Sequence, residues 1–240
     1  MKPSAVSRIG LIVPPPGDRV PADAALLYGH QVDFVARSLG ITGVSPEGFA
    51  PVIDQVVERA LELRRQGAEA ISLMGTSLSF YRGAEWTDRL RAQMTEATGV
   101  PCTTMSHAIV AALRALDVRR VAVATAYVDA LNERLRDYLN GQGFEVTALE
   151  GLSMTHAADI EGVGPSALIG LAERVFASDE SADGIFISCG GLQTHEVIEP
   201  LERRLGVPVA ASSPAGFWDV MRLAGRDPFA VGFGRLFRGG

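Results

Sequence analysis

The sequence predicts an α/β protein made of two similar, doubly wound halves whose parallel sheets are related by a pseudo-twofold axis. Two observations carry this prediction. Short apolar runs alternate with longer helix-type patterns along all 240 residues, as in βαβ proteins. The runs of the second half also repeat those of the first. We expect residues 1–116 to form the first half and 117–211 the second, with the C-terminal helix in 212–240 joining the first half.

The first half opens with a strand over residues 8–13. Pro14, Pro15 and Pro16 end it, because proline has no N–H to donate to a neighbouring strand. The later patterns predict, in order, a strand at 32–37, a helix at 49–66 stopped by Gly67, a strand at 68–74, a loop at 75–81, a helix at 86–98 and a strand at 100–103.

The second half follows the same plan. Its patterns predict a strand at 120–125, a loop at 126–129, a helix at 130–140, a strand at 144–149, a helix at 165–177, a strand from 185 that ends at Cys189, a helix at 196–205, a strand at 207–210 and a last helix from about Pro214.

Three pairs of strands align between the halves with a nearly constant displacement. Residues 8–13 match 120–125, residues 69–75 match 183–189, and residues 99–102 match 206–209. Cys189 therefore corresponds to Gly75. Ligands of open α/β sheets gather at the carboxyl ends of the strands, so we expect the site in the cleft between the halves, with these two residues on opposite sides.

Composition narrows the classes of partner. The net charge of −6, with scattered basic residues, argues against nucleic acid and acidic membranes, and favours a small molecule. No apolar segment reaches membrane-spanning length, and Met1–Arg8 lacks the apolar centre of a signal peptide, so a cytoplasmic location is expected. We also expect a monomer.

The reactive side chains are few. The only lysine is Lys2, which removes Schiff-base chemistry inside a site. Cys102 and Cys189 lie far apart in sequence, which indicates neither a disulfide nor a zinc site, and Cys102 is expected to be simply buried. The histidines also lack metal-ligand spacing; they are His30, His107, His156 and His195. We therefore expect catalysis without a metal or cofactor.

Hydrogen-bond donors accumulate at the predicted strand ends. Gly75, Thr76 and Ser77 offer two hydroxyls and consecutive backbone N–H groups, which suit a carboxylate or an enolate. Tyr127, on the corresponding loop, adds a phenol, and Gly190 adds an N–H. Each such residue on its own is more often a turn former, but here they converge at corresponding strand ends.

Five stretches together closely resemble the arylmalonate decarboxylases of the aspartate/glutamate racemase superfamily: residues 75–83, 101–106, 124–127, 188–192 and 212–219. The resemblance spans nearly the whole chain. It implies two similar α/β halves around a cleft, in which racemases place one cysteine on each side of the substrate carbon. Since Gly75 occupies the first of these positions here, Cys189 is implied to be the sole acid, delivering a proton to one face.

The resemblance implies cofactor-free decarboxylation of α-aryl or alkenyl malonates to enantioenriched monoacids. A dicarboxylate would lose carbon dioxide and leave an enediolate held by Thr76, Ser77, Tyr127 and the Gly190 N–H. An apolar wall for the departing carboxylate is implied at Ile41, Val44, Leu78, Ala157 and Ile160, with Pro15. The segment 151–165 departs from the family pattern. Gln193 and His195 are more polar than the family pattern implies, and His195 is expected to face solvent at a helix start.

Other functions remain open from the sequence. A racemase or a maleate-type isomerase would need a second thiol or covalent addition of Cys189 to an alkene, and Gly75 argues against the first. A protein that binds small carboxylates without turning them over would keep the same hydroxyl loop. Every site residue could also be a turn former in a purely structural duplication.

Overall fold

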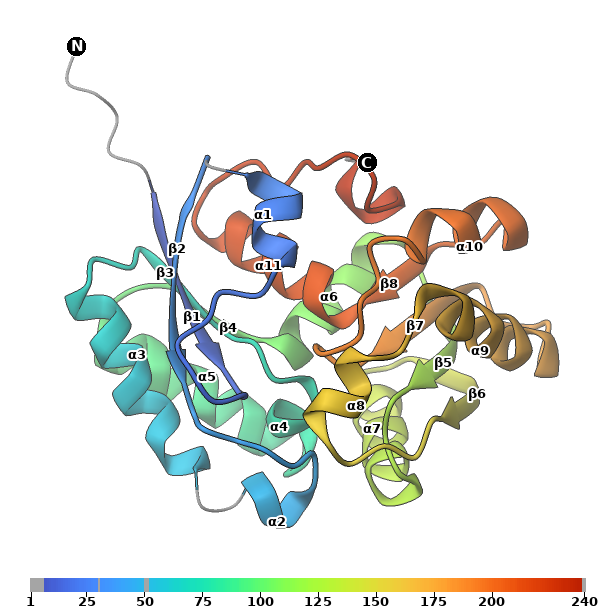
Figure 1. Ribbon diagram of the computed structural model, residues 1–240, viewed down its shortest axis with the longest axis horizontal. Coiled ribbons are helices and arrows are strands. Elements are labelled where there is room, and N and C mark those ends of the chain that lie inside the picture. Colours follow the sequence, from blue (N-terminus) through green and yellow to red (C-terminus); the bar gives the residue numbers. More distant parts are fainter. Residues whose placement is uncertain (1–6, 30, 50–51, 239–240) are drawn as a thin grey trace.

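The framework of the molecule is two four-stranded parallel sheets with the same strand order, β2-β1-β3-β4 and β6-β5-β7-β8 (Figure 1). This computed structural model describes residues 7–29, 31–49 and 52–238, so Lys2 and His30 lie outside it. The strands are β1 (Arg8–Val13), β2 (Asp33–Ser38), β3 (Ala70–Leu73), β4 (Cys102–Thr104), β5 (Arg120–Thr125), β6 (Glu145–Gly151), β7 (Gly184–Ser188) and β8 (Val209–Ala211). The predicted fold class is confirmed.

The registers of the two sheets confirm the internal duplication. Ile9 of β1 pairs with Ala70 of β3, and the corresponding residue of β5, Val121, pairs with Gly184 of β7. The next pair of strands agrees as well, since Ile71↔Cys102 in the first sheet corresponds to Ile185↔Val209 in the second. The residues aligned from the sequence therefore occupy equivalent places in both sheets, and Gly75 and Cys189 follow equivalent strands.

Helices cover both sheets. They are α1 (Asp23–Tyr28), α2 (Pro46–Phe49), α3 (Val56–Arg65), α4 (Thr76–Phe80), α5 (Ala84–Thr98), α6 (Met105–Ala115), α7 (Asp129–Gly141), α8 (Ala157–Glu161), α9 (Pro165–Ser178), α10 (Ile198–Leu205) and α11 (Ser212–Leu223), with short 3-10 turns η1 (Ile53–Gln55) and η2 (Arg235–Phe237). In Figure 1 the first half lies to the left, the second to the right, and α6 and α11 between them.

Two predicted elements differ in the structure. The single helix expected at 49–66 is wrong, because α2, η1 and α3 divide the segment. Phe49, the last residue of α2, has its ring centroid 5.2 Å from that of Tyr81. The loop expected at 75–81 contains α4, whose five side chains are all buried. Helices α1, α6 and α8 were not predicted.

The helix α11 joins the two halves. It packs against α6, β3 and β4 of the first half and against β7 and β8 of the second. Its residues from Ser212 to Met221 are all buried, so the hydrophobic core continues through it from one sheet toward the other. Asp219 of this helix accepts a hydrogen bond of 2.7 Å from the Thr103 hydroxyl of β4. The assignment of 212–240 to the first half stays a prediction.

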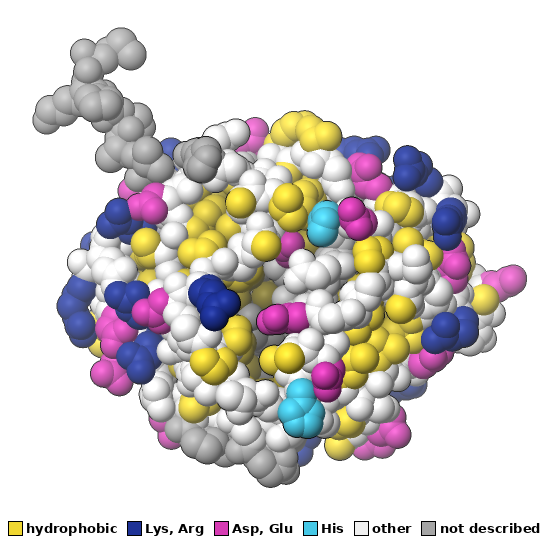
Figure 2. All heavy atoms as spheres, in the orientation of Figure 1, with side chains coloured by type: hydrophobic (Ala, Val, Ile, Leu, Met, Phe, Trp, Pro, Cys, Tyr) yellow, Lys and Arg dark blue, Asp and Glu magenta, His cyan; other side chains and the backbone are white. Residues whose placement is uncertain are grey.

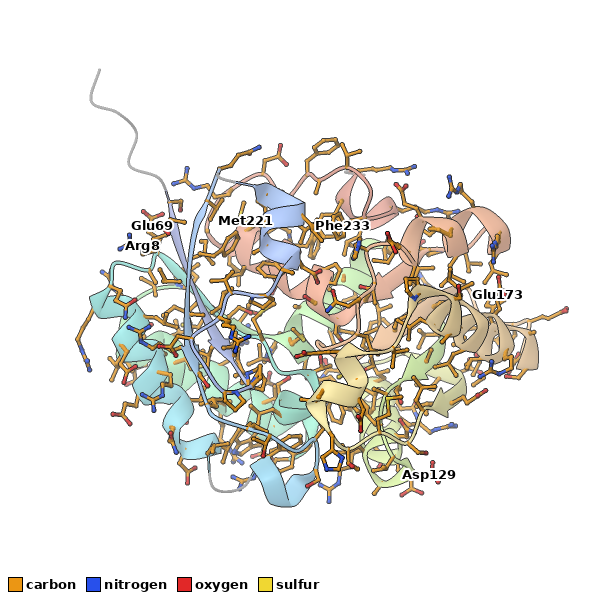
Figure 3. All side chains as sticks on the ribbon, viewed as in Figure 1. Arg8, Glu69, Asp129, Glu173, Met221 and Phe233 are labelled. Atoms are coloured by element: carbon orange, nitrogen blue, oxygen red, sulfur yellow. The ribbon has the colours of Figure 1, made fainter. Side chains whose placement is uncertain are left out.

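The amino ends of the first sheet are held by charged groups. Arg8 forms an ion pair of 2.5 Å with Asp33, and Glu69 lies beside Arg8 at the same end (Figure 3). The carboxyl ends of the strands lie at the other edge of the sheet, facing the second half. Among the described residues, no helix is both long and apolar enough to cross a membrane.

Candidate active site

A cavity of about 600 Å³ lies at the carboxyl ends of the strands, between the two halves. On the face shown in Figure 2, hydrophobic side chains gather around a hollow with isolated charged groups at its edge. The cavity is lined by every residue that the sequence analysis proposed for the site: Cys189, Gly75, Thr76, Ser77, Tyr127 and Gly190, together with Pro15, Ile41, Val44, Leu78, Ala157 and Ile160.

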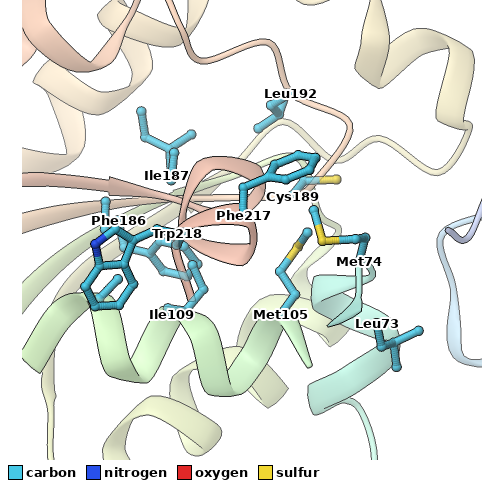
Figure 4. Close-up of a cluster of buried hydrophobic side chains, with 14 of the residues drawn as sticks. Leu73, Met74, Met105, Ile109, Phe186, Ile187, Cys189, Leu192, Phe217 and Trp218 are labelled. Carbon is cyan, nitrogen blue, oxygen red and sulfur yellow. The ribbon is translucent and has the colours of Figure 1, made fainter. Parts of the chain in front are cut away.

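Cys189 directly follows β7 and is 8% exposed. Figure 4 shows it in a cluster of buried side chains that also contains Phe217, Met74 and Met105. Burial raises the pKa of its thiol to about 11, although hydrogen bonds from the Gly191 backbone and from Tyr127 act in the opposite direction. The thiol is therefore protonated at neutral pH, as a proton donor must be.

The backbone of Cys189 is strained. Its φ of 146° lies in a region that side chains with a Cβ rarely adopt, and such a residue costs about 1–3 kcal/mol. Its N–H donates a hydrogen bond of 3.2 Å to the hydroxyl of Ser212, the first residue of α11. Sequence reasoning missed Ser212, although it lies within the stretch 212–219 that carries the family resemblance.

Gly75 presents the opposite case. It precedes α4 with φ −131° and ψ 101°, an extended conformation open to any residue. A Cβ built there would lie 2.9 Å from Pro14 Cγ, closer than real Cβ atoms approach, and 3.1 Å from Leu78 Cβ, which is a tight contact. The glycine at this strand end therefore keeps space free, and backbone conformation does not require it.

The hydroxyl-bearing side chains of the site, Thr76, Ser77 and Tyr127, are buried. Tyr127 is fully buried, its hydroxyl lies 3.4 Å from the Ser188 hydroxyl, and the nearby hydroxyls of Thr76 and Ser77 act to lower its pKa. Burial raises the pKa of Tyr127 well above its ordinary value, so it remains a phenol and can donate. The Thr76 hydroxyl donates to Met105 Sδ at 2.7 Å.

The rim of the cavity includes residues that the sequence analysis did not single out. The segment 14–22, which follows β1, forms one wall, and the rule that pointed to residues 75–77 applies to this strand end as well. Among the described residues that line the cavity, Arg19 is the one cation and Glu161 the one carboxylate, and both are exposed. Further lining residues are Val13, Thr42, Phe49, Met74, Ala158 and Gly191.

Gln193 and His195 have different positions. Gln193 lines the cavity, as its place after the cysteine motif suggested. His195, expected to face solvent at a helix start, lies in the turn before α10 and is partly exposed. Its side chain is only 35% exposed, its Nδ1 is buried without a partner among the described residues, and α10 begins three residues later. The buried Asp23 lies near enough for His195 to lower its pKa, against the stronger raising effect of burial.

Cys102 does not line the cavity, and the described residues form no cluster of metal ligands. Cys102 is buried, as predicted, and contacts the Thr98 hydroxyl at 3.5 Å without lining the cavity. Within the ranges that the structure describes, no group of three or more histidine, cysteine, aspartate or glutamate side chains is placed to hold a metal ion.

Comparison with known proteins gives consistent results. Residues 9–237 match the family model described as arylmalonate decarboxylase. The chain is 50% identical over 238 residues to arylmalonate decarboxylase of Bordetella bronchiseptica, covering 99% of each chain. It is also 29% identical to maleate isomerase of Nocardia farcinica, covering 97% of this chain and 96% of that protein.

A solved structure shares the fold closely. This is the liganded form of an arylmalonate decarboxylase mutant in which one glycine is replaced by cysteine and one cysteine by serine. It superimposes with a TM-score of 0.95 at 50% sequence identity, covering 97% of this chain and 99% of that one.

Proposed function

The chain belongs to the arylmalonate decarboxylase family, and from this premise we propose that it removes carbon dioxide from α-aryl or alkenyl malonates without a cofactor, through an enediolate that Cys189 protonates on one face. The proposal rests most heavily on one observation. The buried, protonated thiol of Cys189 lines the cavity, and the equivalent position in the first half is Gly75, which has no side chain.

The first step separates the two carboxylates of the substrate. The retained carboxylate accepts hydrogen bonds from the hydroxyls of Thr76, Ser77 and Tyr127 and from the Gly190 N–H. The other carboxylate lies against the apolar wall, where poor solvation disfavours its charge more than it disfavours neutral carbon dioxide. The electron pair of the breaking C–C bond moves into the retained carboxylate and forms an enediolate, which an aryl or alkenyl group further delocalises.

The second step delivers one proton. The Cys189 thiol gives its proton to the α-carbon of the planar enediolate, and the new C–H bond takes the electron pair back from the enediolate. The resulting thiolate regains a proton from water. One carbon dioxide leaves and one proton enters, so the product is a monocarboxylate, with its handedness set by the face that the thiol approaches.

Turnover of phenylmalonate tests the proposal. Purified protein should release carbon dioxide without added metal or nucleotide, and in deuterium oxide the product should carry one deuterium at the α-carbon. Removal of a general acid costs about 10²–10⁴-fold in rate, so Cys189→Ala should lose turnover by that order. The matched control is Cys102→Ala, which removes the other buried thiol away from the cavity. Wild-type turnover in Cys189→Ala would contradict the role of the thiol.

The alternatives predict other products. A maleate-type isomerase, as named for the relative from Nocardia farcinica, would convert maleate to fumarate. A racemase would exchange the α-hydrogen of an amino acid or of the monoacid with solvent. A protein that only binds small carboxylates would hold phenylmalonate for hours without product. Carbon dioxide release without either exchange or isomerisation supports decarboxylation alone.

Three further expectations belong to the same proposal. We propose a monomer in the cytoplasm, with residues 1–116 and 212–240 in one domain and 117–211 in the other. Size-exclusion chromatography with light scattering tests the first, because a mass of twice 25.5 kDa would contradict a monomer. Limited proteolysis that separates the chain near residues 117 and 211 would support the domain division.

A further inference from the structure

We propose that Ser212 is a positioning residue that holds the main chain of Cys189 in its strained conformation and thereby aims the thiol at one face of the intermediate. The inference deepens the proposed function and rests on it for its catalytic consequence. The structural claim, that Ser212 fixes the position of the Cys189 thiol, does not depend on the proposed activity. It stands on the positive φ of Cys189 and on the bond from its N–H to the Ser212 hydroxyl.

A strained residue persists only where its surroundings hold it. The Cys189 N–H is withdrawn from the sheet ladder, which ends with β7 at Ser188, and its partner is the Ser212 hydroxyl at 3.2 Å. Ser212 is 1% exposed and begins α11 directly after β8, the strand that pairs with β7. The hydroxyl is thus fixed by a helix packed on both halves, which makes it a rigid acceptor.

The direction of the thiol depends on this bond. Rotation about the N–Cα bond of Cys189 swings its Cβ and Sγ together, so a relaxed φ would turn the sulfur away from its present place. Gly190 and Gly191 follow directly, and both line the cavity. The Ser212 hydroxyl therefore fixes the donor and the start of the turn that carries the Gly190 N–H. A proton donor without a fixed position would transfer its proton more slowly and with less preference for one face of the intermediate.

The equivalent residue of the first half contacts the same loop one position further along. By the alignment of the two sheets, in which Cys102 corresponds to Val209, Met105 at the start of α6 corresponds to Ser212 at the start of α11. Met105 Sδ accepts a hydrogen bond from the Thr76 hydroxyl, one residue after Gly75. Thr76 corresponds to Gly190, so the first residue of the helix after the fourth strand contacts the strand-end residue itself in the second half and the residue after it in the first half.

The test uses two neighbouring serines. Ser212→Ala removes the acceptor of the Cys189 N–H, whereas Ser213→Ala is the matched control. Ser213 is 3% exposed, lies in the same helical turn and bonds Asp23 instead. Both variants should lose similar thermal stability. Only Ser212→Ala should lower kcat, by about tenfold with less than about twofold change in KM, because misplacement of a reacting group costs rate more than binding. With an α-aryl-α-methylmalonate, whose product has a stereocentre, it should also lower the enantiomeric excess.

A second readout does not depend on turnover. Alkylation of Cys189 by iodoacetamide, with the Cys189→Ser protein as the blank for Cys102, should become about threefold or more faster in Ser212→Ala, because a released turn exposes the thiol. Ser213→Ala should react like the wild type, and Ser212→Thr, which keeps a hydroxyl, should recover most of the wild-type rate. If the wild type releases no carbon dioxide, the proposed function fails, while the alkylation rates still decide the role of Ser212.

Equal kcat and equal alkylation rates in Ser212→Ala and the wild type would overturn the proposal. So would equal losses of kcat in Ser212→Ala and Ser213→Ala, because these would indicate a structural role shared by the whole turn. Should Ser212→Ala fail to fold, amide hydrogen exchange in the wild type serves instead. A Cys189 N–H protected from exchange supports the bond, and rapid exchange contradicts it.

Discussion

Gly75 after β3 and Cys189 after β7 are equivalent strand ends. Each holds the residue type that the backbone conformation of the other would suit. Gly75 has φ −131°, which any residue adopts, whereas Cys189 has φ 146°, where glycine would be comfortable. Space explains the first, since a Cβ at Gly75 would press on Pro14 and Leu78. The proposed mechanism explains the second, because it needs one proton donor in the cavity. Residue identity at both ends follows from the shared cavity.

The same difference extends to the surroundings. The Gly75 end begins α4, whose hydroxyls point to the cavity and have Met105 as a neighbour. The Cys189 end begins an irregular turn held by Ser212. In the proposed mechanism, one half thus supplies neutral donors for the negative charge of the enediolate, and the other supplies the acid that protonates it.

The strongest way to break this complementarity is to place an acid on both sides. Gly75→Cys adds a thiol at the empty end, and we expect the chiral monoacid formed from an α-aryl-α-methylmalonate to be racemised, with a gain in racemisation rate on the order of 10²–10⁴-fold. Chiral chromatography of the product over time measures it. Gly75→Ala is the control, since it adds the Cβ that crowds Pro14 without an acid. Unchanged enantiomeric excess in a folded Gly75→Cys protein would show that the two positions do not face one carbon.

The pH dependence of alkylation sharpens the account of the Cys189 end. The thiolate is the reactive form, so with the pKa raised to about 11 the alkylation rate should rise about 100-fold between about pH 8 and about pH 10. An exposed cysteine would level off near about pH 9. Decarboxylation should not fall over the same range, because the thiol keeps its proton until the pH approaches that pKa. A plateau below about pH 9 would contradict the raised pKa.

Smaller effects are expected from the charged rim. Malonate substrates are dianions, and Arg19 and Glu161 are exposed charges of opposite sign at the cavity. Arg19→Gln should raise KM by about two- to fivefold and Glu161→Gln should lower it, since exposed charges contribute about 0.2–1 kcal/mol. Both shifts in KM should shrink as salt is added. Shifts of the same sign in the two variants would exclude an electrostatic origin.

The smallest expected effect concerns the strain itself. Cys189→Gly and Cys189→Ala both remove the thiol, but only glycine tolerates φ 146° without strain. Cys189→Gly should therefore be the more stable of the two by about 1 kcal/mol, or about 2–4 °C in Tm for a chain of this size. Thermal melting of the two variants measures the difference. A more stable alanine variant would mean that the turn relaxes when the sulfur is absent.

The strand ends could be predicted because their pattern is repeated. Apolar runs that end in glycine, proline or a hydroxyl residue mark the carboxyl ends of buried strands, and their duplication placed Gly75 opposite Cys189. The registers of both sheets confirm this alignment. Segment 14–22 obeys the same rule, so its contribution to the cavity was predictable in principle.

Helices buried on most sides were harder to predict. In α6, seven of eleven residues are buried, so its sequence lacks the polar face that marks a surface helix. The hydroxyl-rich segment of α4 looks like a turn and becomes a helix only because its side chains are covered by both halves. The roles of Ser212 and Met105 depend on contacts between residues far apart in the chain, and no local pattern reports such contacts.

The position of α11 also has a consequence for synthesis on the ribosome. This helix covers β3, β4 and α6, yet it follows every strand of both sheets in chain order. The apolar face that it covers on the first half therefore stays open while residues up to 211 are being translated. We expect the nascent first half to need either a chaperone or a pause in its maturation until residues 212–223 emerge. Completion of the first half and placement of the proton donor in the second then occur in the same late event.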